Sequence, residues 1–339
     1  MPSDDVIAYF VEYWDEQATL TRQFRLNSFK DGTLELLDLK TKRMFLKRIY
    51  CPEISRDRLF LGSVVNVFGR SLQVTAAADV GTTKYLERCT STASALCLVE
   101  DLSALPAIVA ALHGGFGSVR SLKTVFVGDL SPAAQDRLAC GPDRVAVAIE
   151  VYDATTTECE SRLREIVSGL RGVVAEACFG ADSMVGPDVQ NCAARLDAGE
   201  CTLCLIKPHV VKDKLAGSML ECIFAAGFSI EGAQQMTLDA DMAHQFYGAY
   251  KGVLARYEDI VGELAGGPLL ALRISGPVAA FREFCGPTDV KLATALRPKS
   301  LRATFGKGVV HNAVHATDLD DDGAFECDFF FNVLSGGVA

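Results

Sequence analysis

The stretch LCLIKPHVV, Leu203–Val211, is a short apolar run of strand-forming residues followed by a lysine and a proline. A matching stretch, LCLVED, begins at Leu96, 107 residues earlier, and repeats the apolar run. Self-similarity at a fixed separation indicates that one structural unit occurs twice in the chain. We therefore interpret the chain from residue 92 onward as two copies of a single unit.

Other landmarks recur in the same order, with separations that grow along the chain. The matched pairs are Gly115-Phe116 with Gly227-Phe228, Gly141-Pro142 with Gly267-Pro268, and Ala177-Cys178-Phe179 with Ala313-Val314-His315. The separation rises from 107 to 136 residues, so the first copy is 29 residues shorter. Of these, 14 are missing between the first helix and the Gly-Pro strand, and 10 between that strand and the last landmark.

The second copy shows strands that alternate with helices. The residue patterns predict the strands Leu203–Ile206, Ser229–Leu238, Leu269–Ile274 and Cys327–Val333, the helices Leu215–Ala226 and Val278–Cys285, and a helix-rich stretch ending at Leu264. Gly227 is expected to cap the first of these helices. This order predicts an α+β fold with a βαββαβ core.

The N-terminal region, residues 1–88, has a different pattern. Short alternating runs flank Lys30-Asp31-Gly32, which indicates a hairpin, and a second pair lies in FLGSVVNVFGRSLQVTAAAD. No catalytic group of residues stands out, so we expect a small β module for docking. The stretch VGTTKYLERCTSTASA, residues 80–95, is predicted to be a linker. The predicted domains are therefore 1–88, 92–190 and 200–335.

The composition narrows the class of protein. The 339 residues carry a net charge of −10, which argues against broad nucleic-acid binding. We expect neither a signal peptide nor a transmembrane helix. The twelve cysteines follow no framework, which is typical of a reduced intracellular protein. Cys201 and Cys204 form a lone CxxC in an apolar strand; buried cysteines are a better interpretation than a zinc or redox site.

His315 is the candidate nucleophile, because an imidazole can accept a phosphoryl group and divide one transfer into two steps. Phosphoryl transfer also needs cations and donors around the transferred group. The second copy offers Lys207, Arg282, Arg302, Tyr247 and Thr288. Taken singly, each of these residues is more often structural or solvated, and spacing alone does not assign them a role.

From Thr202 to Phe331 the sequence resembles a nucleoside diphosphate kinase domain. The stretches that match are LCLIKPHVV, GSMLECIFAAGF, GPLLALRI, FREFCGPTD, LRPKSLRATFG and NAVHATD, in this order. The resemblance implies a ferredoxin-like fold and a ping-pong exchange of the γ-phosphate between nucleoside triphosphates, such as ATP, and diphosphates. Mg²⁺ would arrive on the nucleotide phosphates, and no protein metal site is expected.

The resemblance also implies the role of each matched residue. His315 would be phosphorylated, Glu326 would position it, and Lys207 and Tyr247 would lie beside the transferred phosphate. The residues that would bind the nucleotide phosphates are Arg282, Thr288 and Arg302. Asn312 would contact the ribose, and Val309 and Tyr257 would sandwich the base.

Two motifs depart from the family pattern. The usual KPD is Lys207-Pro208-His209, and the usual HGSD is His315-Ala316-Thr317-Asp318. Ala316 adds a Cβ where the backbone could be tight, and this puts the rate in doubt more than the chemistry. Asp320, Asp321 and Asp322 could repel nucleotide weakly, although a solvated loop is the better interpretation.

The first copy resembles the same family in LCLVEDLSALPAIVAALHGGF, GPDRVAVAIEV and EACFGADS. Its lysine position is Glu100, its asparagine position Glu176 and its histidine position Phe179. The deletions remove the segment that carries Tyr247 and fall among the Arg282, Thr288 and Arg302 equivalents. We therefore expect phosphotransferase activity in the second copy only, with the first kept for packing or partner contact.

The N-terminal module resembles the DM-ten domain of axonemal proteins. A DM-ten domain before tandem kinase-like domains implies a place in the cilium or flagellum, on tubulin of the doublet microtubules beside neighbouring axonemal proteins. No membrane or nucleic-acid partner is expected. The alternative is a soluble active kinase in the cytoplasm, or a regulator of the γ-tubulin complex; we find no acidic cluster that supports an exonuclease. The shortened first copy favours a pseudo-dimer within one chain, or a monomer on a lattice, over the hexamer of ordinary family members.

Overall fold

The computed structural model describes residues 6–334 except 16–17, 52–53, 55, 57–58, 60–61, 90, 117, 154–158, 180–188 and 197–198. The end of the first copy, around EACFGADS, therefore lies partly outside the described residues. The described residues form two compact units. One contains the N-terminal region and residues 237–267, and the other contains most of both copies. The helices of the described residues are all too short or too polar to cross a bilayer.

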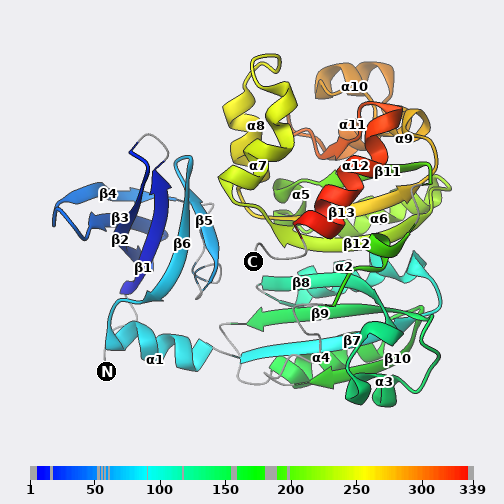
Figure 1. The fold of residues 1–339 in the computed structure, drawn as a ribbon, viewed down its shortest axis with the longest axis horizontal. Coiled ribbons are helices and arrows are strands. Elements are labelled where there is room, and N and C mark those ends of the chain that lie inside the picture. The colour runs from blue at the N-terminus through cyan, green and yellow to red at the C-terminus, as the bar shows by residue number, and fades with distance from the viewer. Residues whose placement is uncertain are drawn as a thin grey trace. The chain divides into compact units, whose positions relative to one another are not determined.

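The N-terminal region forms a six-stranded antiparallel sheet in the order β4-β3-β2-β1-β6-β5 (Figure 1). Its elements are β1 (Val6–Asp15), β2 (Leu20–Phe29), β3 (Thr33–Asp38), β4 (Met44–Tyr50), β5 (Val64–Val67), β6 (Arg70–Ala77) and helix α1 (Val80–Cys89). The predicted hairpin joins β2 to β3, and Gly32 supplies the positive φ of its turn. The same unit holds α7 (Ala240–Tyr247) and α8 (Tyr257–Leu264), and the Ala240 amide donates to the Ser71 hydroxyl of β6 at 2.7 Å.

The predicted linker at residues 80–95 is wrong. Helix α1 begins at Val80, and the Asp79 carboxylate accepts a hydrogen bond from the Thr82 amide at 2.8 Å, as an N-cap does. Thr82 in turn accepts from the Ala8 amide of β1, and Leu86 is buried in the core of the sheet. The polar composition of this stretch concealed one apolar contact and one cap, which together dock the helix.

The second unit contains one sheet of eight strands, β10-β7-β9-β8-β12-β13-β11-β14. The first copy supplies β7 (Ser91–Val99), α2 (Leu105–Gly115), β8 (Ser118–Phe126), α3 (Pro132–Leu138), β9 (Val145–Asp153), α4 (Cys159–Ser168) and β10 (Val173–Phe179). The second supplies β11 (Cys201–Ile206), α5 (Pro208–Lys212), α6 (Ala216–Ala225), β12 (Ile230–Thr237), β13 (Pro268–Ser275), α9 (Val278–Cys285), α10 (Val290–Leu296), α11 (Leu301–Phe305), β14 (Val314–Ala316), α12 (Gly323–Asp328) and a π-helix (Phe329–Val333).

Each copy orders its four strands in the same way, so the α+β, ferredoxin-like βαββαβ fold is confirmed for this region. The copies join where β8 pairs with β12, at Lys123 with Gln234 and Leu122 with Gln235. Helices α2 and α6 pack closely, because Gly217 of α6 lies where a Cβ would stand 2.7 Å from Ala110. One apolar core extends through both copies. The chain is therefore a pseudo-dimer of kinase-like domains.

The segment between the copies reinforces this junction. Asn191, which is 1% exposed, donates to the Ala233 carbonyl at 2.7 Å and accepts from the Thr124 hydroxyl at 3.1 Å. Thr124 also accepts from the Ala233 amide at 3.0 Å. These bonds satisfy backbone groups of β12 beyond the two paired positions, which would otherwise be buried without partners.

The predicted last strand at Cys327–Val333 is also wrong. These residues lie in α12 and the π-helix, and the last strand of the copy is β14. Cys327, Phe330 and Phe331 are buried, whereas Phe325 and Val333 are exposed. Buried positions three and four residues apart are the spacing of a helix. Packing of this face overrides the strand preference of the aromatic run.

Candidate active site

His315 lies on β14, opposite Leu205 of β11, and is 7% exposed. The preceding Ala313 has a φ of +72°, which is unusual for a residue with a Cβ. Its carbonyl accepts from the Lys207 amide at 3.0 Å. This bond ties the turn before the histidine to the end of β11. No pattern in the sequence signals the strained turn.

Glu326 of α12 orients the imidazole. The Nε2 atom of His315 lies 3.0 Å from Oε2 of Glu326, and the Thr317 hydroxyl donates to the same oxygen at 2.8 Å. Thr317 also accepts from the Leu203 amide at 2.9 Å. With the Nε2 proton directed at the carboxylate, the lone pair of the neutral ring is on Nδ1. This is the protonation pattern that a histidine nucleophile requires.

Helix α12 can approach the sheet because Gly323 has no side chain. A Cβ on Gly323 would stand 1.9 Å from the Cys201 carbonyl oxygen. Any other residue would push the helix away, and Glu326 lies one turn further along the same helix. The sequence contains a signal for this residue only in retrospect, as a glycine just before an amphipathic helix.

Lys207 and Asn312 are buried near the same turn. Lys207, 2% exposed, follows β11 and donates from Nζ to the Val310 carbonyl at 3.1 Å. Asn312 is 5% exposed, and its Oδ1 has no hydrogen-bond partner among the described residues. A buried amide oxygen without a donor is costly, and a ligand hydroxyl would satisfy it. The family role, contact with a ribose, fits this orphaned acceptor.

Arg302 of α11 lies behind the histidine strand. Its Nη1 donates to the Gly286 carbonyl at 2.6 Å and its Nη2 to the Val314 carbonyl at 3.2 Å. Its Nε is buried without a hydrogen-bond partner in the part of the chain that the structure describes. The guanidinium is thus fixed in orientation and retains a donor that an anionic oxygen could accept from.

Arg282, Thr288 and Val309 are more exposed. Arg282 of α9 pairs with Asp318, with Nη2 3.1 Å from Oδ1, and also donates to the Asp318 carbonyl. Thr288 is exposed in the loop between α9 and α10, and Val309 is 44% exposed. Arg282 would have to exchange Asp318 for phosphate when nucleotide binds. The assigned roles of these three residues stay predictions.

Tyr247 and Tyr257 lie in α7 and α8, in the unit that contains the N-terminal sheet. Both are buried, and the Tyr257 hydroxyl lies 3.2 Å from Nδ1 of His244. Burial raises the pKa of the Tyr257 phenol, so the hydroxyl stays protonated at neutral pH. Their assigned roles beside the phosphate and the base also stay predictions.

The substitution of Ala316 is accommodated. Ala316 lies in extended β14, opposite Cys204, and is buried without a positive φ. Position 316 therefore does not require glycine; the tight backbone is at Ala313 instead. Asp320, Asp321 and Asp322 form a short 3-10 turn before α12 with no buried member, which agrees with a solvated loop.

The strand register corrects one assignment in the first copy. His315 faces Leu205, and the equivalent of Leu205 in LCLVED is Leu98, which faces Ala175 of β10. Ala175, rather than Phe179, therefore stands at the histidine position. The shift of four residues keeps the same face of the strand, so a period-two pattern could not distinguish the two alignments. Alanine provides no nucleophile either, and Glu100 still follows β7 where Lys207 follows β11.

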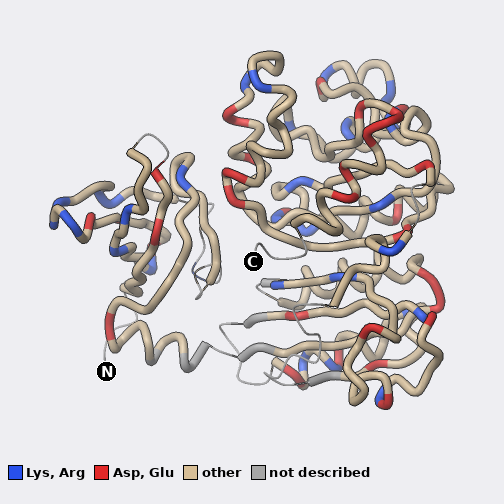
Figure 2. The backbone as a smooth tube through the Cα atoms, viewed as in Figure 1, with Lys and Arg blue, Asp and Glu red and all other residues tan. Residues whose placement is uncertain are grey.

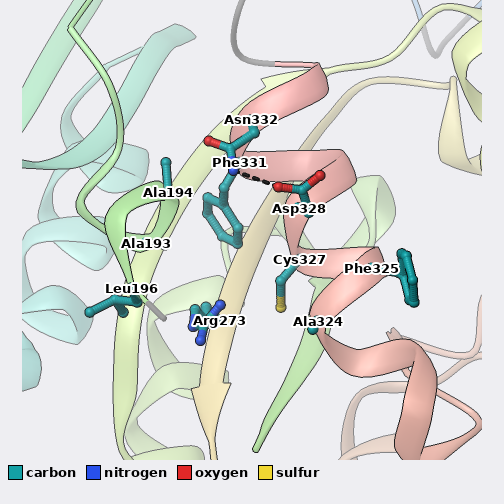
Figure 3. A pocket seen from close by; sticks show the side chains of 10 residues that line it. All are labelled: Ala193, Ala194, Leu196, Arg273, Ala324, Phe325, Cys327, Asp328, Phe331 and Asn332. Carbon is teal, nitrogen blue, oxygen red and sulfur yellow. Dashed lines mark hydrogen bonds between the residues drawn. The ribbon is translucent and has the colours of Figure 1, made fainter. Parts of the chain in front are cut away.

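A separate pocket of about 380 Å³ lies along α12 (Figure 3). It is lined by Ala193, Ala194, Leu196, Arg273, Ala324, Phe325, Cys327, Asp328, Phe331 and Asn332. None of the predicted nucleotide residues lines it. Beside it, hydrogen bonding to Cys327 lowers the pKa of Cys201 to about 7, while burial raises that of Cys204 well above its ordinary value. The two cysteines of the CxxC have different neighbours, as their opposite faces predict.

The described residues contain no group of three or more His, Cys, Asp or Glu side chains placed to hold a metal ion. A nucleotide pocket is instead supported by the two orphaned polar atoms, Oδ1 of Asn312 and Nε of Arg302. Both residues lie on the segments that hold His315.

Comparison with known proteins agrees with the fold and the site. The family model "Nucleoside diphosphate kinase" matches residues 200–334. Nucleoside diphosphate kinase homolog 7 of Mus musculus is 33% identical over 96% of this chain and 93% of its own. A nucleoside diphosphate kinase of Streptomyces avermitilis is 36% identical over 38% of this chain and 94% of its own. A crystal structure of the Aquifex aeolicus enzyme is 29% identical over 40% of this chain and 97% of its own, with a TM-score of 0.38. The chain belongs to the nucleoside diphosphate kinase family.

Proposed function

We propose that the second copy transfers the γ-phosphate of a nucleoside triphosphate to a nucleoside diphosphate through phospho-His315. The observation that carries this proposal is the 3.0 Å bond between Nε2 of His315 and Glu326. It directs the lone pair of Nδ1 toward a substrate and stabilises the positive charge that develops on the ring.

In the first half-reaction, Nδ1 attacks the γ-phosphorus and the bond to the β,γ-bridging oxygen breaks, which releases the diphosphate. In the second, a terminal β-phosphate oxygen of another diphosphate attacks phospho-His315 and the P–N bond breaks. Lys207 and Arg302 would neutralise the transferred phosphoryl group, and Asn312 would accept from the ribose hydroxyl. Mg²⁺ carried on the nucleotide phosphates would supply further neutralisation of charge.

The test is autophosphorylation of the purified chain with γ-labelled ATP and Mg²⁺. We expect label that is acid-labile and alkali-stable, lost in His315→Ala and retained in His311→Ala, which removes another imidazole from the same segment. Added GDP or CDP should then remove the label as the triphosphate. A folded protein that takes up no label, or that keeps it in His315→Ala, would contradict the proposal.

A second candidate function is placement on ciliary or flagellar doublet microtubules, with tubulin and neighbouring axonemal proteins as partners. Two observations favour it: the N-terminal sheet resembles a DM-ten domain, and the first copy is kept although it lacks a nucleophile. A regulator of the γ-tubulin complex, or a cytoplasmic kinase, is the alternative. A tagged chain in ciliated cells should remain with detergent-extracted axonemes. Its release with the soluble fraction would refute the placement.

A further inference from the structure

Strand β4, Met44–Tyr50, is one edge of the N-terminal sheet. It pairs with β3 on one side, and no other strand of the described residues pairs with its second side. An edge strand of this kind presents a row of backbone N–H and C=O groups that a further strand can bind. The pairing with β3 shifts register twice, at Leu34/Leu36 and at Leu36/Leu37.

The side chains of β4 are unusually exposed for an apolar strand. Met44, Phe45, Ile49 and Tyr50 are 47%, 42%, 41% and 62% exposed. They are nevertheless ordered by their neighbours: the Phe45 ring lies 4.7 Å from that of Phe24, and a Cβ on Gly32 would meet the Tyr50 ring at 2.9 Å. Four large apolar side chains on one edge form a patch of the kind that marks an interaction site.

The same edge is strongly basic in an acidic chain. Residues 39–51 carry five cations and no acid, whereas the whole chain has a net charge of −10. Arg48 pairs with Asp31 at 2.7 Å. The other four cations, Lys40, Lys42, Arg43 and Lys47, are exposed and make no salt bridge with any described residue. Figure 2 shows blue segments gathered along β4 and the turn before it.

We propose that β4 is a docking edge for an extended acidic polypeptide segment, which adds to the sheet as a seventh strand. The partner backbone would pair with the outer side of β4, its carboxylates would face the four unpaired cations, and its alternate side chains would cover Phe45 and Ile49. This proposal does not depend on phosphate transfer by His315.

Protection from aggregation and binding of nucleic acid each account for only part of this edge. Lysines and register shifts on an edge strand can protect it from aggregation, but protection does not require four exposed apolar side chains beside them. A nucleic acid would need a broad basic surface, and here the cations are confined to one short strand and its turn on a chain of net negative charge.

The test uses the full chain and a labelled peptide that alternates glutamate with valine, about ten residues long so that it covers a strand of common length. We expect binding that weakens with salt. Hydrogen exchange should slow at the amides of Met44–Tyr50 and not elsewhere in the sheet. Reversal of Lys42, Arg43 and Lys47 to glutamate should weaken binding by about tenfold or more, because each loses an attraction and gains a repulsion.

The matched control reverses three exposed cations in other elements, Arg171, Lys291 and Lys299, and should bind as the unchanged chain does. A scrambled-charge peptide with lysine in place of glutamate should not bind. The proposal is overturned if the acidic peptide does not bind, if both triple variants weaken it equally, or if β4 amides gain no protection. Tighter binding of a DNA duplex or of anionic lipid vesicles at the same residues would also overturn it, by assigning the edge to another class of partner.

Discussion

Replacement of Gly323 by alanine tests how the structure positions the nucleophile. The added Cβ would stand 1.9 Å from the Cys201 carbonyl oxygen, while ordinary carbon–oxygen contacts begin near about 3.3 Å. Helix α12 must therefore move by roughly 1.4 Å, since the strand carbonyl is held in the sheet. Overpacking of this kind costs about 1–3 kcal/mol of stability.

The same displacement acts on the chemistry, because Glu326 belongs to the helix that moves. Its bond to His315, now 3.0 Å, would lengthen beyond hydrogen-bond range. A misplacement of about 1 Å at a reacting group can cost on the order of a hundredfold in rate. We expect Gly323→Ala to lower the rate of His315 labelling by about ten- to a hundredfold while the protein remains folded.

The measurement pairs the labelling rate with urea unfolding of the same preparation. Gly114→Ala is the matched control: it also adds a methyl group to a helical glycine, but no atom lies within 4 Å of the new Cβ. It should leave the labelling rate unchanged and leave stability the same or raise it by up to about 1 kcal/mol. If Gly323→Ala labels and unfolds like the unchanged chain, the close approach of α12 does not set the position of the carboxylate.

Three further predictions concern the junction and the site. Gly232→Ala should destabilise the chain by about 1–3 kcal/mol in urea, because its Cβ would meet that of Ala193 at 2.4 Å in the segment that joins the copies; an unchanged midpoint would contradict this. Burial lowers the pKa of His113 below its ordinary value of 6.5, so the native state binds fewer protons than the unfolded one, and the melting temperature should fall as pH drops below about 6.5. A His113→Gln variant with the same pH slope would refute that origin. Thr317→Val removes the hydroxyl bonded to Glu326 at 2.8 Å and should slow His315 labelling and cost about 1–3 kcal/mol; equal labelling would show that the carboxylate needs no second support.

Much of the second copy could be predicted from the sequence because its elements are locally consistent. The helix Val278–Cys285 was predicted with its observed limits, and the buried run Leu203–Ile206 is the main part of β11. Gly227 has a φ of +86°, and the amides of Gly227 and Phe228 bond back to Phe224 and Ile223 as in a Schellman cap. Apolar runs and special glycines of this kind are visible without knowledge of the tertiary structure.

The errors arose where distant contacts decide the structure. The aromatic run Cys327–Val333 has strand preference, yet it is helical because one face packs on the sheet. In the candidate site, the resemblance identified His315 and Glu326, whereas the link through Thr317 to the Leu203 amide depends on strands that are more than a hundred residues apart in sequence. No local pattern contains that information.

The first copy explains its own retention by packing alone. Its strand β8 completes the junction with β12, and His113 of α2 lies 2.9 Å from Gln235, whose amide donates to the Val119 carbonyl at 2.6 Å. Without this copy, the edge of β12 would lose its partners and the core that both copies share would be opened to water. A copy that serves this purpose needs its strands and its helix face, but not a nucleophile. Selection for stability of the second copy is therefore sufficient to preserve the first one after Ala175 had taken the place of a histidine.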